Sequence, residues 1–456
     1  MKTSKTIKLW MSAFAAGTTM LVVSSCDSLL NVQPVNQVDA AQSLTTGQGV
    51  QVTLTGAYDG LSNRYVYGGE PWVYADLLAD DNEVRFSGTF AYMDEIWRKS
   101  IVVLSTGSSE PWLNGYDAIN RANTVLSALD KLTTAERPTV EGAAKFIRAA
   151  TYFELVRSFA KTWGDGDNNT NPGVPLVLTP TNVVTSADNV ARASVAAVYT
   201  QIINDLTSAE SLLPATSNGT RANKAVAAAL LSRVYLMQGN YAAARDAANR
   251  VIATNRYSLA ANFGDAFDES TGAFATEVIF RITVTEQDGL NQQNVFYAPA
   301  AFGGRGDIRI QTKHTALYDA ADARGQFFYR AGSFTYTSKH RFQYGDVIAF
   351  RIAEMYLTRA ECNARLGTEV GATPAADVNR IRKRAGLPDL ATPTVNDILK
   401  ERKLELAFEG HRIHDLKRTR STIGADNLPF SSNRVVFPIP QREIDVNKNL
   451  VQNPGY

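Results

Sequence analysis

Apolar residues recur at steps of three and four positions through much of the chain, a spacing that places them on one face of an α-helix. The clearest such face stops at Pro214, which ends the helix, and it consists of Tyr199, Ile202, Ile203, Leu206, Ala209, Leu212 and Leu213. Residues 116–132 and 140–159 have the same pattern, with a short turn around Pro138 between them. The pattern predicts a mainly α fold.

Two segments are spaced like tetratricopeptide repeats. The first, residues 224–256, predicts two antiparallel helices through Leu231, Tyr235, Gly239, Tyr241, Ala244 and Val251. A looser copy covers residues 350–386, and its second helix follows Pro374. Because such helix pairs bury their faces only against neighbours, we expect one packed helical scaffold with long loops and a few short strands.

Residues 163–189 and 263–344 interrupt the helical pattern and are rich in Gly, Pro, Asn and aromatic residues. Loops of this length in a compact protein usually serve a function, and their aromatic content argues against disorder. Short strands are predicted at residues 278–284 and 434–437, where β-branched and aromatic residues cluster.

Six aromatic residues in loop-like segments are candidates for ligand binding. They lie beside Gly or Pro residues that break helical periodicity, so they are less obliged to fill a helix interface. The candidates are Trp72, Tyr65 and Tyr67 in one group and Phe296, Tyr297 and Phe302 in another. Trp72 is the strongest of them, whereas Trp112 and Tyr152 are assigned to the core. For each loop ring the alternative is packing beneath the loops.

The N-terminus has the three parts of an export signal. Lys2, Lys5 and Lys8 precede an apolar stretch over residues 9–23, and Ser24-Ser25-Cys26 follows where cleavage would fall. The apolar stretch is shorter than the roughly 20 residues that a spanning helix needs. Residues 23–26 resemble a bacterial lipobox, so we expect residues 1–25 to be a lipoprotein signal peptide. Residues 26–40 would then form a polar tether lipidated at Cys26.

The composition argues mainly against some classes of partner and of site. The formal net charge of the 456 residues is +1, which gives no long-range field for nucleic acid or another polyanion. Besides Cys26, the chain has one cysteine, Cys362, and its helical surroundings predict a small core group.

The motifs of enzymes and metal sites are weak or absent in this sequence. Asp165, Asp167 and Asn169 are spaced as in a calcium loop, but Thr170 stands where the turn requires Gly. His411 and His414 lack the four-residue spacing of a metalloprotease helix. There is no G-x-S-x-G elbow and no phosphate loop. We therefore expect no catalytic residues, no metal and no cofactor.

Glutamates recur every fourth residue near the C-terminus, interleaved with arginines and apolar residues. This spacing predicts an ion-pair network on a packed helix that stabilises the fold and does not contact ligand, formed by Glu401, Glu405, Glu409 and Arg412.

Several motifs resemble the SusD/RagB family. The sequence ERKLELAFEGHR at residues 401–412 is similar to the C-terminal signature of that family, and DLKR at 415–418 continues it. The closing PIP at 438–440 and QNPGY at 452–456 also match, as does NRIRKRAGLP at 379–388. In the N-terminal half the lipobox and RAATYFELVR at 148–157 agree. The resemblance extends over nearly the whole chain.

The resemblance implies a lipid-anchored protein of the cell outer membrane, exposed at the surface, that captures a nutrient for a partner TonB-dependent transporter. The ligand would be a glycan or, in some branches of the family, a peptide. Residues 41–260 would form the N-terminal helical region and residues 261–456 the C-terminal region with a loop-rich face. A helical-repeat scaffold for protein partners and an exported hydrolase remain as alternatives.

Overall fold

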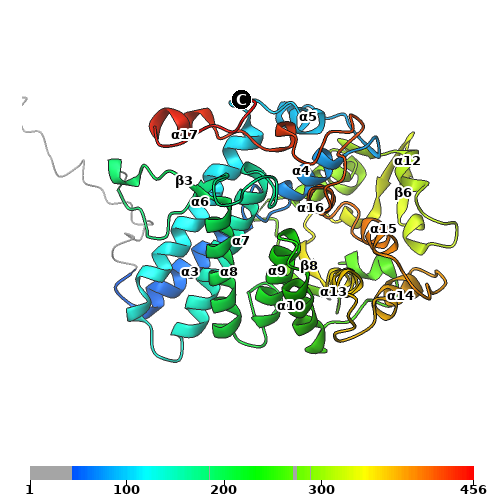
Figure 1. Cartoon of the computed structure of the whole chain (residues 1–456), viewed down its shortest axis with the longest axis horizontal. Helices are drawn as coiled ribbons and strands as arrows, with labels where there is room; N and C mark the ends of the chain where they lie inside the picture. The colour runs from blue at the N-terminus through cyan, green and yellow to red at the C-terminus, as the bar shows by residue number, and fades with distance from the viewer. Residues whose placement is uncertain (1–43, 184, 271–274, 288) are drawn as a thin grey trace, which may run out of the picture.

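The computed structural model describes residues 44–183, 185–270, 275–287 and 289–456, so the predicted signal peptide, Cys26 and the tether lie outside the described residues. The fold is mainly α (Figure 1). Its helices in chain order are α3 (Gly47–Ser62), α4 (Glu70–Ala79), α5 (Ala91–Arg98), α6 (Thr106–Ser127), α7 (Arg137–Phe159), α8 (Val195–Leu212), α9 (Lys224–Met237), α10 (Tyr241–Ala253), α11 (Gln292–Tyr297), α12 (Thr312–Thr315), α13 (Ile352–Leu366), α14 (Pro374–Arg384), α15 (Val395–Glu405), α16 (Arg412–Arg418) and α17 (Gln441–Val446). None of these helices has both the length and the apolar character needed to cross a membrane.

Neighbouring helices pack side by side in the order α3, α6, α7, α8, α9, α10, α13 and α14. The two predicted repeats are confirmed, since α9 with α10 and α13 with α14 are the expected helix pairs. Helix α10 packs directly on α13, although about 100 residues of loops and strands separate them in sequence. Side chains from both predicted regions, from Val50 to Leu450, share one apolar core.

Three small antiparallel sheets lie among the loops. The largest has the strand order β1-β5-β7-β6, and the others pair β2 with β3 and β4 with β8. The strands are β1 (Val84–Phe86), β2 (Pro172–Pro175), β3 (Arg192–Ser194), β4 (Val278–Ile282), β5 (Ile308–Ile310), β6 (Phe328–Ala331), β7 (Phe334–Thr337) and β8 (Val347–Arg351). The strand predicted at 278–284 is confirmed as β4.

Two local predictions differ from the structure. The strand predicted at 434–437 is wrong, because residues 433–435 form a 3-10 turn capped by the Ser432 hydroxyl, which accepts a hydrogen bond from the Arg434 amide. The helix predicted from residue 116 begins ten residues earlier, at Thr106. Ser105 caps it by accepting from the Gly107 amide, and Pro111 lies inside it.

Candidate functional site

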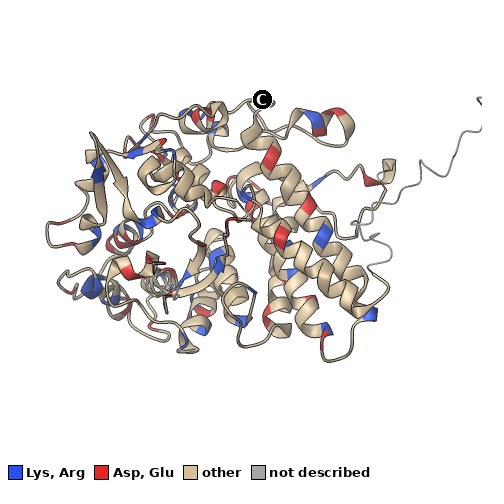
Figure 2. Ribbon diagram, turned by 180° about the vertical axis from the view of Figure 1, so that it is seen from behind, with Lys and Arg blue, Asp and Glu red and all other residues tan. Residues whose placement is uncertain are grey.

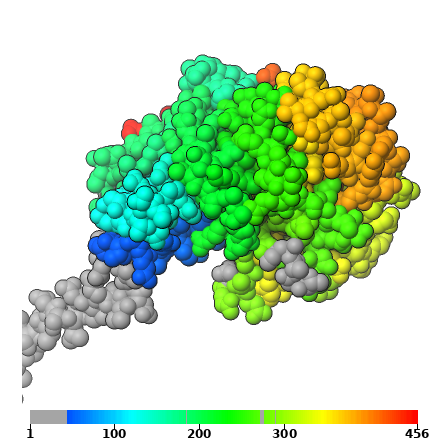
Figure 3. All heavy atoms as spheres, turned by 90° about the horizontal axis from the view of Figure 1, so that it is seen from below, coloured from blue at the N-terminus to red at the C-terminus, as the bar shows by residue number. Residues whose placement is uncertain are grey.

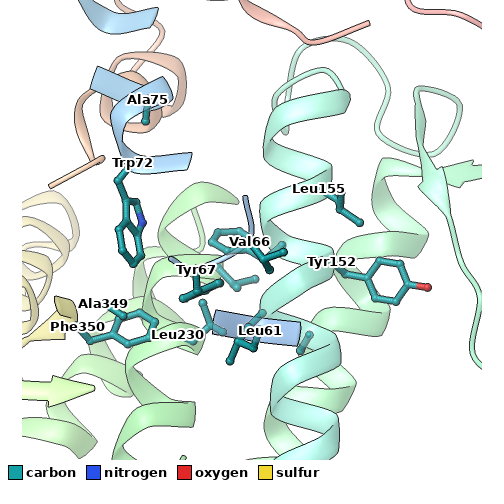
Figure 4. Close-up of a cluster of buried hydrophobic side chains, with 14 of the residues drawn as sticks. Leu61, Val66, Tyr67, Trp72, Ala75, Tyr152, Leu155, Leu230, Ala349 and Phe350 are labelled. Carbon is teal, nitrogen blue, oxygen red and sulfur yellow. The ribbon is translucent and has the colours of Figure 1, made fainter. Parts of the chain in front are cut away.

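Four of the six candidate rings are core residues. Trp72, Tyr67, Phe296 and Tyr297 are each at most 4% exposed. Figure 4 shows Tyr67 and Trp72 among buried apolar side chains that include Leu61, Leu230 and Phe350. Since a buried ring cannot stack on a ligand, the predicted binding role of these four residues, including the leading candidate Trp72, does not fit the structure.

A glycine far away in the sequence holds Trp72 in the core. Gly410 has a φ of +75°, and a Cβ at this position would lie 2.3 Å from Cδ1 of Trp72. A side chain there would clash, so the glycine lets the indole pack against the backbone. Tyr297 is held in the core by a hydrogen bond: its hydroxyl donates to the Asp76 carboxylate at 2.9 Å. The loss of helical periodicity marks close packing here and not exposure.

Tyr65 and Phe302 remain partly exposed. The guanidinium of Arg64 lies 5.0 Å from the centre of the Tyr65 ring, and that of Arg341 lies 4.3 Å from the Phe302 ring. Phe302 also packs edge-on against Tyr329. These two rings are the members of the predicted set that a ligand can reach.

A wide cleft provides a different candidate site. Its volume is about 1640 Å³, counted with its opening to solvent, and it lies between α3, α6 and the loops around α11. Figure 3 shows this face of the molecule hollowed between the N-terminal helix in blue and the light green segment that follows β4. Residues far apart in the sequence line the cleft: they lie within 59–68, 114–121, 282–287 and 289–305, together with Phe90.

One wall of the cleft presents planar polar side chains. Arg121 forms salt bridges of 2.9 Å with Asp59 and 2.8 Å with Asp117, and all three side chains are at least 40% exposed. Nearby, the amide of Asn63 donates a 2.8 Å hydrogen bond to Asn114. Guanidinium, carboxylate and amide groups fixed in this way offer donors and acceptors in defined directions.

The facing wall combines apolar and polar groups. The guanidinium of Arg305 lies 4.6 Å from the centre of the Phe90 ring and forms a 2.8 Å salt bridge with Asp307. Leu290 is 37% exposed. Oε1 of Gln292 is buried and has no hydrogen-bond partner among the described residues. Together the two walls suit a ligand with many hydroxyl groups and some apolar surface.

Arg64 connects the cleft to a buried carboxylate. It forms a salt bridge with Glu70, which is fully buried and also accepts a 2.5 Å hydrogen bond from the Tyr74 hydroxyl. Burial raises the pKa of Glu70, although Arg64 and Tyr74 partly offset that rise. Arg64 itself is 39% exposed, so its orientation at the cleft is fixed from inside the protein.

The sequence reasoning missed the residues of the cleft because it searched for aromatic rings. Asp59, Asp117 and Arg121 lie on α3 and α6, where charged residues usually form a solvated face, and Arg305 lies in a loop. The same rule could have found one residue of the cleft: Phe90 is an aromatic residue near a glycine, since it follows Gly88 and Thr89 between β1 and α5.

The C-terminal glutamates lie in a buried ionic network. Arg351 forms salt bridges with Glu405 at 2.8 Å and with Glu409 at 2.6 Å, and it also pairs with Glu277. Arg324 pairs with Glu401 at 2.5 Å, and Lys339 pairs with Glu409 at 2.5 Å. Burial alone would raise the pKa of Glu409, but the charges of Arg351 and Lys339 outweigh it and lower this pKa to about 2.

Arg412 differs from its predicted role. It is half-buried and forms no ion pair with any residue in the described part of the chain. The predicted continuous helix also ends early, because α15 stops at Glu405 and the φ angles of Phe408 and Gly410 are +63° and +75°. The chain therefore reverses direction, and Glu409 meets Lys339 and Arg351 and not Arg412.

The weak metal motifs gain no support from their surroundings. The Asp167 carboxylate accepts hydrogen bonds from the Asn169 amide at 2.9 Å and from the Thr170 hydroxyl at 3.4 Å within its own turn. Over the described ranges, no three His, Cys, Asp or Glu side chains are grouped to hold a metal ion. Cys362 is fully buried, as predicted.

Comparison with known proteins identifies the family. A family described as "Starch-binding associating with outer membrane" matches residues 30–236, and the SusD family matches residues 325–431 and 419–456. The chain belongs to the SusD/RagB family. A SusD-like protein of Formosa agariphila is 25% identical over 509 aligned positions, which cover 95% of this chain and 96% of that protein.

Two further relatives of the chain have descriptions that name starch or sugar binding. The starch-binding protein SusD of Bacteroides thetaiotaomicron is 36% identical over 123 residues, 24% of this chain and 22% of that protein. A solved structure from Bacteroides vulgatus, described as a putative sugar binding protein, is 27% identical with a TM-score of 0.80 and covers 91% of this chain and 99% of its own. The C-terminal family match includes Lys339, Arg351 and Glu409, so the buried network lies within the SusD/RagB region.

Proposed function

We propose that this protein captures an oligosaccharide in the cleft at the outer membrane and passes it to a partner TonB-dependent transporter. The observation that carries the proposal is the pair of facing walls: fixed polar groups around Arg121 on one side, and Leu290 and Phe90 on the other. Sugar hydroxyls bond to the first kind of wall, and their C–H surfaces pack on the second. The starch-binding and sugar-binding descriptions of the relatives support the same ligand class.

Binding without catalysis fits the chemistry of this cleft. The carboxylates of Asp59 and Asp117 both bond to Arg121, an arrangement that fixes them as hydrogen-bond acceptors. A glycosidase instead needs one carboxylic acid kept protonated beside an ionised carboxylate. We infer that the cleft holds its ligand unchanged for transfer.

The proposal includes a lipid anchor at Cys26, followed by the tether over residues 27–40. The basic, apolar and small-residue order of residues 1–25 supports it. Acyl chains on one cysteine would hold the folded body at the membrane, where each buried methylene contributes about 0.8 kcal/mol.

Calorimetry with the mature protein tests the ligand class. Titration of α-glucan, β-glucan, mannan and xylan oligosaccharides against mixed peptides of five to ten residues should give binding only to an oligosaccharide. Arg121→Ala should then weaken binding by about thirtyfold, corresponding to about 2 kcal/mol, with the melting curve nearly unchanged because exposed salt bridges contribute about 0–1 kcal/mol.

Arg250→Ala is the matched control, since Arg250 is 47% exposed and pairs with Glu210 away from the cleft. If only the peptides bind, the ligand of this protein is a peptide and not a glycan. Equal affinity in the wild type and in Arg121→Ala would remove the cleft as the site.

Metabolic labelling with a clickable fatty acid tests the anchor. The wild-type protein should carry the label and sediment with membranes, and Cys26→Ala should lose both properties. Cys362→Ala controls for labelling of a thiol inside the folded body, because Cys362 is fully buried. A labelled and membrane-bound Cys26→Ala protein would contradict the anchor.

A further inference from the structure

A second cavity lies on the other side of the segment that joins α3 to α4. Arg64 and Gly68 of this segment line the wide cleft, whereas Tyr65 and Val66 line the second cavity. Its inner part is small, with about 30 Å³ that a water-sized group can occupy, and the volume is about 590 Å³ when the open mouth is counted. Helices α4, α6, α7 and α16 surround it. The segment therefore separates two spaces of different chemistry.

Three nitrogen-bearing side chains line this second cavity. Lys417 is 3% exposed, donates one hydrogen bond of 2.7 Å to the carbonyl of Val435, and has no ion-pair partner within the described ranges. Nε of Arg157 and Nδ1 of His414 are both buried and have no hydrogen-bond partner there. All three residues line the same space.

The charges around the cavity do not balance. Arg157 pairs with Glu154, which leaves the ammonium of Lys417 as the uncompensated charge of the lining. Asp165 attracts this ammonium only from beyond ion-pair distance. Burial lowers the pKa of Lys417 to about 8, helped by the charge of Arg157, so the ammonium stays mostly protonated at pH 7. A buried charge with unmatched N–H groups is costly unless an acceptor occupies the space beside it.

The remaining lining is apolar. Tyr65, Pro71, Pro111, Phe159 and Phe437 contribute ring and aliphatic surface to the same cavity. Burial and the nearby cations lower the pKa of His414 well below its ordinary value, so the imidazole is neutral and can donate from Nδ1. The arrangement is a cluster of donors with a positive charge on one side and an apolar surface on the other.

We propose that this cavity binds a small oxyanion, a carboxylate or sulfate group, through Lys417, Arg157 and His414. The group is either a free anion or the acidic substituent of a sugar whose ring stays in the open mouth, because the inner space of about 30 Å³ holds only the small charged group. Because the segment 63–69 separates the cavity from the cleft, this site is independent of the glycan proposal.

Calorimetry on the mature protein in a chloride buffer tests this site with sodium sulfate, sodium glucuronate and glucose. Wild type should bind at least one of the two anions and not glucose, and Lys417→Met should reduce that affinity at least tenfold. Binding of glucuronate alone identifies an acidic sugar, and equal binding of both anions identifies a free oxyanion. Lys145→Met is the matched control, because Lys145 lies on α7 outside the cavity and pairs with Glu141.

A crystal soaked in selenate, an anomalously scattering analogue of sulfate, gives a second measurement that does not depend on a variant. An anomalous peak within hydrogen-bonding distance of Nζ of Lys417 is the expected result. The proposal is overturned if the soaked cavity shows no peak and neither anion binds the wild type. It is overturned equally if Lys417→Met binds the anions as the wild type does, which would leave the cavity to water.

Discussion

In the helical half of the molecule, from α3 to α10, most buried side chains between helices are apolar, as on α9, where Ala225 to Leu231 are all buried. The buried Arg148–Asp205 pair, which joins α7 to α8, is an exception there. In the C-terminal half the centre holds Arg324, Arg351, Glu405 and Glu409. Figure 2 shows basic and acidic residues over both halves, and the salt bridges show that those of the C-terminal half meet in its interior.

The difference has a structural cause. The helices of the first half are long and consecutive, so each finds its apolar partner close by in the sequence. The second half must fix loops, short strands and short helices that offer little apolar surface. Arginine–glutamate pairs join segments that lie far apart in the sequence, such as the bidentate pair of Arg351 with Glu409, 58 residues away, and Arg324 with Glu405, 81 residues away. Removal of single groups from each half tests this comparison.

The largest effect is expected from Glu409→Ala. This change leaves Arg351 and Lys339 without one of their buried carboxylates, and breaking a buried pair from one side costs about 3–5 kcal/mol. Urea denaturation measures the loss. Arg412→Ala is the control and should change stability by less than about 0.5 kcal/mol, because Arg412 forms no ion pair with the described residues. An unchanged unfolding curve for Glu409→Ala together with lost ligand binding would instead place Glu409 in a binding site.

The sequence predicted the first half better than the second for the same reason. Periodicity reports local apolar faces, and it correctly gave α8, α9 and α10. It placed Glu401, Glu405 and Glu409 on one helix, but the positive φ of Phe408 turns the chain before Glu409. The partner Lys339 lies 70 residues away, beyond the reach of any spacing rule.

The candidate site was equally hidden in the sequence. Arg121, Leu290 and Arg305 share one cleft only because α6 packs near the loops around α11. The Gly and Pro residues next to the six rings were interpreted as signs of exposed rings, whereas Gly410, more than 300 residues from Trp72, makes room for its indole. Composition cannot distinguish a glycine that frees a loop from one that admits a buried ring.

A smaller effect should follow pH. Glu409 has a pKa of about 2 in the folded protein and an ordinary value of 4.5, so its ionisation contributes stability that is complete above about pH 4.5 and is lost as the pH falls towards 2. The difference in unfolding free energy between the wild type and Glu409→Gln should therefore shrink over this range. Burial raises the pKa of Asp76 to about 7, so this residue also makes stability depend on pH. Because Asp76 titrates in both the wild type and Glu409→Gln, most of its contribution cancels in the difference between the two proteins. A difference that stays constant from pH 5 to pH 2.5 would show that Glu409 is not held ionised.

The smallest effect is expected in the helical half, from Ile202→Val on α8. Ile202 is fully buried in the apolar core, and the change removes one methylene without exposing or unpairing a polar group. A change of this kind costs about 0.5–1.5 kcal/mol. Because no titrating group is touched, the loss should be the same at pH 7 and pH 3, in contrast to that of Glu409→Gln. Urea denaturation at both pH values measures it, with Val52→Ala on exposed α3 surface as the control. The loss of unfolding free energy for Ile202→Val could instead vary with pH in the way expected for Glu409→Gln. The stability of the helical half would then depend on the same ionised groups, and the contrast between the two halves would not hold.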